Sequence, residues 1–198
     1  LVDAYSRYSS IYGLPDKSTT TVIRTLTQYA ADHRTVSTYE YFDIARIRSD
    51  AGSQFTSTEF QNFCRTERIQ LSLSAPKKQS QNHLAERSWQ TINRMARSLL
   101  VHARLPDQYH YHAALYATSI FNILPIKDLF TTTGASTTPY FLFTDNKPYI
   151  AHYRVFGCPV VAKKWLVSSH GQTLTKQTER GIRGIFIGFP LNQKEIGR

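Results

Sequence analysis

The chain has 198 residues and a formal net charge of +10, and 41% of its residues are hydrophobic. That length allows one domain, or one domain with a small appendage, and the apolar content is enough for a core. No apolar run is long enough for a transmembrane helix, and we expect no signal peptide. The two cysteines, Cys64 and Cys158, form no paired motif, which argues against a disulfide scaffold and favours a reducing compartment, nuclear or cytoplasmic.

The positive charge is concentrated in two segments. Residues 1–73 are neutral and residues 105–146 carry −2, whereas residues 74–104 carry +5 and residues 147–198 carry +7. Basic segments of this kind favour a polyanionic partner such as nucleic acid. Ordinary solvated helix faces would give the same charge count, so the charge alone leaves both interpretations open.

Strands are expected at three places in the first half of the chain. Residues 1–13 are rich in β-branched and aromatic types and predict a strand or hairpin. Residues 44–47 predict a short strand that leads into Asp50, and residues 69–73 predict another. A mixed α/β sheet is therefore expected if helices lie between these strands.

Helices are expected in the intervals between those strands. Ser18 can cap a first helix, and Thr56 followed three residues later by Glu59 resembles a capping box at the start of a second helix. The apolar stripes of these two helices consist of Val22, Ile23, Leu26, Tyr29 and Ala30 in the first and of Phe60, Phe63 and Cys64 in the second.

The second half begins with a polar loop over residues 74–82, after which a long helix is expected from His83 until Pro106 ends it. A further helix is expected over residues 107–124, with Leu124 facing inward. The inward face of the long helix consists of Ala85, Trp89, Ile92, Ala96, Leu99 and Leu100.

The C-terminal part of the chain has a composition typical of loops and β-strands. Residues 125–150 predict a linker, with a short helical turn at Pro139, and residues 151–198 predict a small β domain. Within that domain, residues 182–189 are expected to form one strand.

Two carboxylates stand at positions where they can converge. Asp50 closes a strand, and Glu86 lies in the first turn of a helix that follows a loop. Converging carboxylates suit a hard divalent cation such as Mg²⁺ or Mn²⁺, and two such ions can promote phosphoryl transfer. Each residue also has a structural explanation, Asp50 as a turn former and Glu86 as a first-turn acid that favours the helix dipole.

Several motifs, in order along nearly the whole chain, resemble the copia-type retrotransposon integrase of the Pol polyprotein. The 35 residues between Asp50 and Glu86 equal the spacing typical of that family. The matching segments are Leu1-Val2-Asp3-Ala4-Tyr5-Ser6-Arg7-Tyr8, Arg48-Ser49-Asp50-Ala51-Gly52-Ser53-Gln54-Phe55, Gln81-Asn82-His83-Leu84-Ala85-Glu86-Arg87, Met95-Ala96-Arg97-Ser98-Leu99-Leu100, and Tyr153-Arg154-Val155-Phe156-Gly157-Cys158 with Gly184-Ile185-Phe186-Ile187-Gly188-Phe189.

This resemblance implies an RNase H-like mixed sheet flanked by helices, truncated at the N-terminus, with a small C-terminal SH3-like β domain. The implied division is a catalytic core at residues 1–124 that lacks its first strand, a linker at 125–150, and a complete or incomplete SH3-like domain at 151–198. The implied reaction joins a DNA 3′-hydroxyl to target DNA, with Asp50 and Glu86 as two of three carboxylates that bind Mg²⁺ or Mn²⁺.

DNA contacts are expected around the helix that carries Glu86. Helical spacing puts its three arginines in one sector away from the apolar face, where they could follow phosphates, and amide side chains precede the helix. The alternative is a solvated face that covers a core helix. The residues of this expected contact are Lys77, Lys78, Gln81, Asn82, Arg87, Arg94 and Arg97.

The sequence departs from the family pattern at the first aspartate and at the loop before the long helix. By the resemblance, the first aspartate would lie upstream of Leu1, and Asp3 falls on the following strand, so Asp3 is not its replacement. His83 stands where the family has glycine. We therefore expect an incomplete enzyme with little strand transfer, or alternatively a non-catalytic DNA-binding or assembly remnant. DNA and further copies of the chain are the expected partners, with no membrane and no small-molecule substrate.

Overall fold

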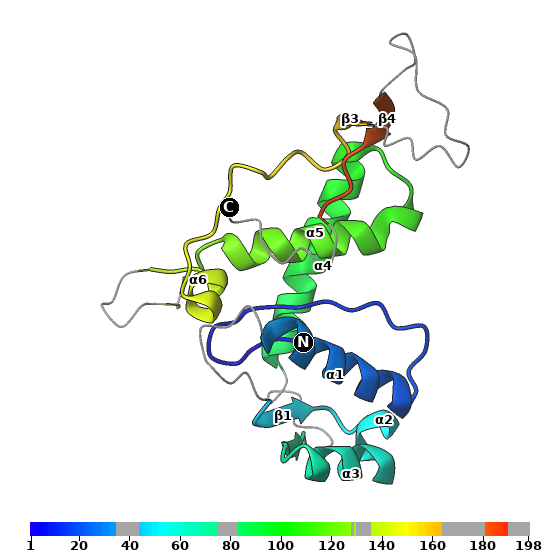
Figure 1. Cartoon of the computed structure of the whole chain (residues 1–198), viewed down its shortest axis with the longest axis vertical. Helices are drawn as coiled ribbons and strands as arrows, with labels where there is room; N and C mark the ends of the chain where they lie inside the picture. The colour runs from blue at the N-terminus through cyan, green and yellow to red at the C-terminus, as the bar shows by residue number, and fades with distance from the viewer. Residues whose placement is uncertain (35–43, 75–82, 128, 130–135, 164–180, 190–198) are drawn as a thin grey trace, which may run out of the picture.

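A computed structural model describes residues 1–34, 44–74, 83–127, 129, 136–163 and 181–189, and helices dominate it (Figure 1). None of the helices in these ranges is long and apolar enough to cross a membrane. In chain order the elements are α1 (Thr19–Arg34), β1 (Arg46–Ser49), α2 (Ser53–Thr56), α3 (Thr58–Thr66), β2 (Gln70–Leu73), α4 (His83–Ala103), the 3₁₀ helix η2 (Asp107–Tyr109), α5 (His110–Ile123), α6 (Pro139–Thr144), β3 (Pro159–Lys163) and β4 (Gly181–Ile185).

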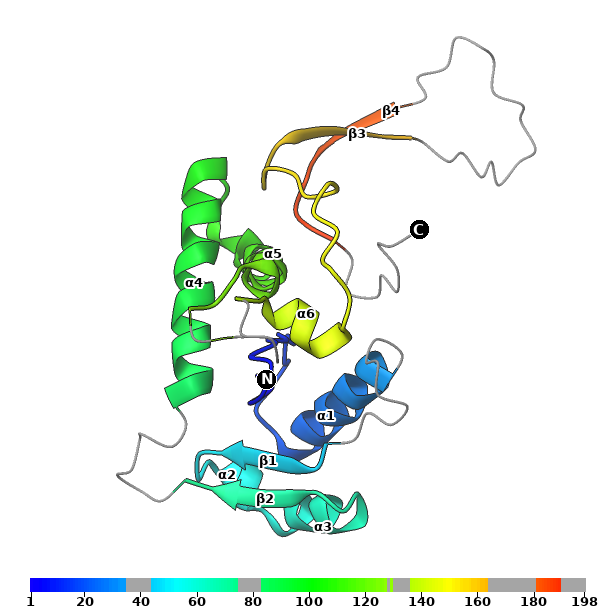
Figure 2. The same ribbon diagram turned by 90° about the vertical axis from the view of Figure 1, so that its left-hand side faces the viewer.

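The N-terminal part contains a small parallel sheet. β1 pairs with β2 in parallel, with Ile47 opposite Leu71, and the connection between them carries α2 and α3 because parallel neighbours need a crossover. Figure 2 shows α1 beside β1, on the side away from β2. One apolar cluster joins α1 and α3, with half-buried Ile47 and Leu71 packed against it, and its buried members are Val22, Leu26, Phe60 and Cys64.

The first residues of β1 and α3 differ from the sequence prediction. β1 begins at Arg46, two residues later than expected. The cap of α3 is Ser57, whose hydroxyl accepts a hydrogen bond from the Phe60 N–H at 3.2 Å, so the prediction of a Thr56 cap was wrong. Glu59 does not complete a capping box, because its carboxylate accepts a hydrogen bond from Thr20 of α1.

The second half is built on the contact between α4 and α5, which cross each other closely (Figure 1). Alanines occupy much of the contact, and their small side chains allow the two backbones to approach. The buried residues of this core on the two helices are Ile92, Ala96 and Leu100 of α4 and Ala113, Ala114, Tyr116 and Ala117 of α5. Trp89 and Leu124 were expected in the core, but they are 46% and 47% exposed.

Residues around Arg154 and Phe186 pack onto α5 through Tyr116. The Tyr116 hydroxyl donates to the Arg154 carbonyl and accepts from the Arg154 N–H. β3 and β4 pair antiparallel, and the strand predicted to run through residue 189 ends at Ile185. Beyond it, the Phe186 backbone still bonds to Cys158 and Gly157, and the rings of Phe186 and Phe189 pack against the Tyr116 ring. The division into a core, a linker and an SH3-like domain stays a prediction.

The first ten residues form a short hairpin that α5 holds in place. Leu1 and Ser10 exchange two hydrogen bonds, and burial lowers the pKa of the Leu1 amine. The Asn122 amide is buried and pairs with both backbone groups of Ser9. Its Oδ1 accepts from the Ser9 N–H and its Nδ2 donates to the Ser9 carbonyl, each at 2.9 Å. One side chain of α5 therefore takes the place of a neighbouring strand.

Replacement of Asn122 by alanine should destabilise the fold. The change leaves the N–H and the carbonyl of Ser9 buried without partners, and each such group costs about 1–3 kcal/mol. We expect Asn122→Ala to lower the free energy of unfolding in urea by about 3 kcal/mol, whereas the exposed control Ser98→Ala should change it by about 0.5 kcal/mol or less. Equal effects of the two substitutions would contradict the role of Asn122.

Candidate metal and nucleic-acid site

Asp50 and Glu86 lie where two distant elements meet at one cavity. Asp50 directly follows β1, and Glu86 lies in the first turn of α4. Their sequence neighbours Ser49 and Ala85 both line a cavity of about 460 Å³. Both carboxylates belong to exposed residues. The fold therefore places the neighbours of both carboxylates in the lining of one cavity, and a joint metal site of Asp50 and Glu86 stays a prediction.

The chemistry of this donor set fits a hard divalent cation. Exposed carboxylates are oxygen ligands, and Mg²⁺ is commonly held by one or two of them together with water and substrate phosphates. Asp50 also accepts a long, 3.4 Å hydrogen bond from the Gly52 N–H, which leaves most of its acceptor capacity for other partners. Across the described ranges, no group of three or more His, Cys, Asp or Glu residues could hold a metal ion.

Asp3 has a structural role in the hairpin. Its Oδ2 accepts hydrogen bonds from the Ser6 N–H at 2.7 Å and from the Ser6 hydroxyl at 2.6 Å. These bonds stabilise the tight turn in which Arg7 adopts a positive φ of 65°. The Asp3 carboxylate is thus engaged in the turn.

The three arginines of α4 lie on the solvent side of the helix. Arg87, Arg94 and Arg97 are exposed, whereas Ile92 and Ala96 are buried against α5. Ten residues of α-helix separate the first arginine from the last, which is about 15 Å along the axis. The exposed sector therefore presents a row of guanidinium groups on the helix that also carries Glu86.

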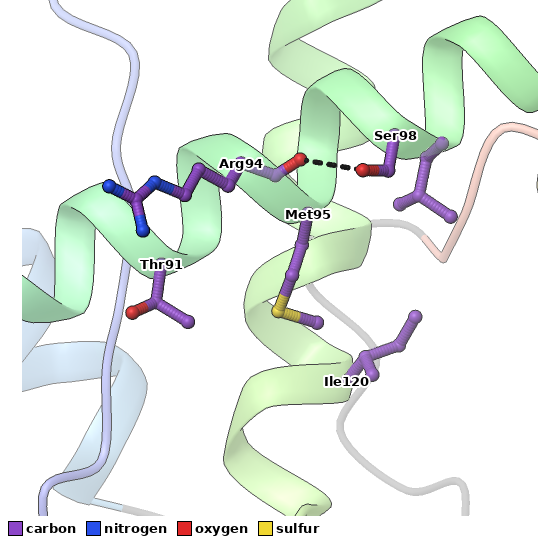
Figure 3. A pocket seen from close by; sticks show the side chains of 6 residues that line it. Thr91, Arg94, Met95, Ser98 and Ile120 are labelled. Carbon is purple, nitrogen blue, oxygen red and sulfur yellow. Dashed lines mark hydrogen bonds between the residues drawn. The ribbon is translucent and has the colours of Figure 1, made fainter.

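A shallow groove borders this row where α4 meets α5. Figure 3 shows Arg94 extended along the helix and Met95 directed toward Ile120, with a hydrogen bond from the Ser98 hydroxyl to the Arg94 carbonyl. The groove has a volume of about 390 Å³, and Leu99 and Thr91 complete its lining. It has an apolar floor and polar residues at its edges.

The other expected DNA contacts, Lys77, Lys78, Gln81 and Asn82, lie outside the described residues. Their participation in a site stays a prediction. Sequence reasoning did not find the cavity between β1 and α4, although small residues at Ala85 and Ser88 beside an apolar helix face were a possible signal. Nothing in the sequence indicated that Asn122 would bind the hairpin backbone.

Sequence comparison finds an integrase core domain and a similar Pol polyprotein. Residues 1–79 match the integrase core domain family. Over 146 residues, or 74% of the chain, the sequence is 31% identical to the retrovirus-related Pol polyprotein from transposon TNT 1-94 of Nicotiana tabacum. The chain spans 10% of the length of that relative.

Solved structures show the same fold at low sequence identity. The catalytic core domain of BIV integrase matches with a TM-score of 0.51 and 17% identity, over 73% of this chain and 82% of that one. The catalytic core domain of HTLV-2 integrase in complex with magnesium, in its trimeric form, matches with a TM-score of 0.50 and 21% identity, over 72% and 80%. The fold is therefore RNase H-like, and residues 1–79 carry the integrase core domain in a chain that is similar to a copia-type Pol polyprotein.

Proposed function

We propose that this chain binds DNA and contributes two metal-binding carboxylates to the joining of a DNA 3′-hydroxyl to target DNA. The observation that carries the proposal is the meeting of β1 and α4 at one cavity, with Asp50 and Glu86 next to its lining residues. The row of arginines on α4 supports the choice of substrate. The integrase core domain of residues 1–79 supports a polynucleotidyl transferase.

Asp50 and Glu86 would hold Mg²⁺ or Mn²⁺. When bound, such an ion neutralises phosphate charge and activates an oxygen nucleophile. Because one carboxylate ends a strand and the other lies on a helix packed in the core, both backbones are held in place. The protein's own contribution is therefore mainly positioning, which is a large part of catalysis when no covalent intermediate on the protein is needed. A magnesium complex among structures of the same fold supports the choice of cation.

The arginine row of α4 would position the DNA backbone. Its length of about 15 Å equals about four base steps of duplex DNA at 3.4 Å each. Such contacts fix the register of DNA on the protein without reading its sequence. We also propose that the chain self-associates, and the trimeric form of the HTLV-2 catalytic core supports this.

A second candidate is a DNA-binding module without catalysis. It is favoured by the two-carboxylate donor set, since the described ranges contain no group of three potential ligands. The two candidates share the arginine contacts and differ in whether residues 1–198 alone can join DNA.

The arginine row makes a specific prediction about salt dependence. Each phosphate contact adds about 0.9 to the slope of log affinity against log salt concentration. Replacement of Arg87, Arg94 and Arg97 together by alanine should reduce that slope by about 2.7 and weaken binding to any duplex sequence. Fluorescence polarisation with a labelled duplex between 50 and 200 mM salt measures both quantities.

A matched control removes the same charge elsewhere. Alanine at exposed Arg24, Arg34 and Arg65 lowers the net charge equally without touching α4. This control should keep nearly the original salt slope. If both triple variants lose the same slope, binding depends on net charge and the α4 contact is wrong.

We expect metal binding to depend on Asp50 and Glu86 but not on Asp3. We expect Asp50→Asn and Glu86→Gln each to weaken Mn²⁺ binding at least tenfold, as water-proton relaxation would show. Asp3→Asn should keep Mn²⁺ binding and instead lower the free energy of unfolding by about 1–2 kcal/mol, because the turn loses a charged acceptor. Loss of Mn²⁺ binding in Asp3→Asn would contradict this assignment.

Residues 1–198 alone should bind DNA but join it poorly, because two carboxylates hold the catalytic ions less firmly than a larger set. The measurement is strand transfer of a donor oligonucleotide into plasmid DNA with Mg²⁺ or Mn²⁺. Robust joining that survives Asp3→Ala but not Asp50→Ala would show that these two carboxylates suffice and would exclude the non-catalytic candidate.

A further inference from the structure

The exposed face of β1 leads directly to Asp50. Side chains alternate between the two faces of a strand, and one face of β1 is turned to the interior, with Ile47 half-buried against the α1–α3 cluster and Ser49 buried. Arg46 and Arg48 share the opposite face and are exposed. Asp50 is the next residue in that alternation and is exposed as well. Two arginines and one of the two candidate metal ligands therefore follow one another along a single surface.

The two arginines of β1 differ in their partners. The sheet register puts Gln70 opposite Arg46 and Ser72 opposite Arg48. The Arg46 Nε–H donates to the Gln70 Oε1 at 2.9 Å, which ties that guanidinium to β2. Among the residues that the structure describes, none accepts a hydrogen bond from the Arg48 guanidinium or forms an ion pair with it. Because a guanidinium carries five N–H donors, those of Arg48 are available to a ligand.

Arg48 lies beside the candidate metal site. It lines the cavity of about 460 Å³ together with Ser49 and Ala85, the sequence neighbours of the two carboxylates. Two steps of extended chain separate Arg48 from Asp50, which is about 7 Å between their Cα atoms. An arginine side chain is long enough to cover that distance, so the Arg48 guanidinium can contact a ligand that Asp50 also binds.

The ligand that fits this position is a phosphate group. The planar fork of an arginine binds two oxygens of one phosphate at once, a geometry that a lysine cannot reproduce. A Mg²⁺ ion held by one or two carboxylates is commonly bound by substrate phosphate as well. One phosphate can therefore occupy the Arg48 guanidinium and supply an oxygen ligand to an ion at Asp50 and Glu86.

We propose that Arg48 is a phosphate-binding residue of the DNA-joining site, and that its guanidinium holds a DNA phosphate next to the ion site of Asp50 and Glu86. This role rests on the proposed function, because it requires DNA and the ion at that place. Arg48 belongs to β1, whereas the arginine row belongs to α4. DNA that contacts both elements spans the cavity between them, which places a phosphate where the two carboxylates can act on it.

The salt dependence of DNA binding without metal tests the phosphate contact. Arg48→Ala should reduce the slope of log affinity against log salt concentration by about 0.9, the value for one phosphate contact. Arg46→Ala is the matched control, since it removes the same charge from the same strand face, and it should change the slope much less. Arg48→Lys should keep the wild-type slope because it keeps the charge. Both arginines are exposed, so all three variants should unfold in urea like the wild-type chain.

The coupling between DNA and Mn²⁺ tests the position of that contact. A phosphate that touches both Arg48 and the ion makes each ligand strengthen the binding of the other, and this coupling is reciprocal. A labelled duplex should tighten Mn²⁺ binding to the wild-type chain about tenfold, as water-proton relaxation measures. The tightening should fall to about threefold or less in Arg48→Ala and persist in Arg46→Ala. Arg48→Lys should retain only part of it, because an ammonium cannot bind two phosphate oxygens as a fork.

Three results would overturn the role of Arg48. The first is an equal salt slope in Arg48→Ala and Arg46→Ala, and the second is an absence of coupling in the wild-type chain. The third is a reduced slope with unchanged coupling in Arg48→Ala, because Arg48 would then bind DNA away from the ion. The proposed function fails by a different measurement, namely Mn²⁺ binding without DNA that survives both Asp50→Asn and Glu86→Gln.

Discussion

The packing of α4 against α5 is the constraint on which the rest of this molecule depends. Alanines at the contact bring the two helices close, and they commit one face of α4, through Ile92, Ala96 and Leu100, to burial. The rotation of α4 about its axis is then fixed. This rotation determines the direction of the arginines and of Glu86 in the first turn. It also determines which residues of α4 line the cavity beside β1.

The same contact connects the two ends of the described chain. On one side α5 holds the N-terminal hairpin through Asn122, and Tyr116 of the same helix binds the backbone at Arg154. Phe156 belongs to the core formed by α4 and α5, with Phe186 packed against it. The helix pair is thus a shared support for the N-terminal hairpin and for the residues that precede β3 and follow β4.

Much of this arrangement could be predicted from the sequence, because periodicity and motif spacing are local properties. The long helix, the alternation of strands and helices around β1 and β2, and the resemblance to integrases were predicted correctly. Periodicity placed Trp89 on the inward face but could not show whether anything covers that face. The β-like composition through residue 189 could not show that the strand ends at Ile185, nor that Phe186 and Phe189 pack on Tyr116 of α5. The predicted roles of Asp50 and Glu86 came from spacing and resemblance, and the structure adds that their neighbours Ser49 and Ala85 line one cavity.

The pairing of Asn122 with Ser9 has a consequence for solubility. An exposed strand edge is a template for other chains, and proteins that leave one uncovered risk edge-to-edge aggregation. By filling both hydrogen-bonding positions at Ser9 with a side chain, α5 closes that edge of the hairpin without adding a strand. The backbone groups of Ser9 are therefore not available to a strand of a neighbouring molecule.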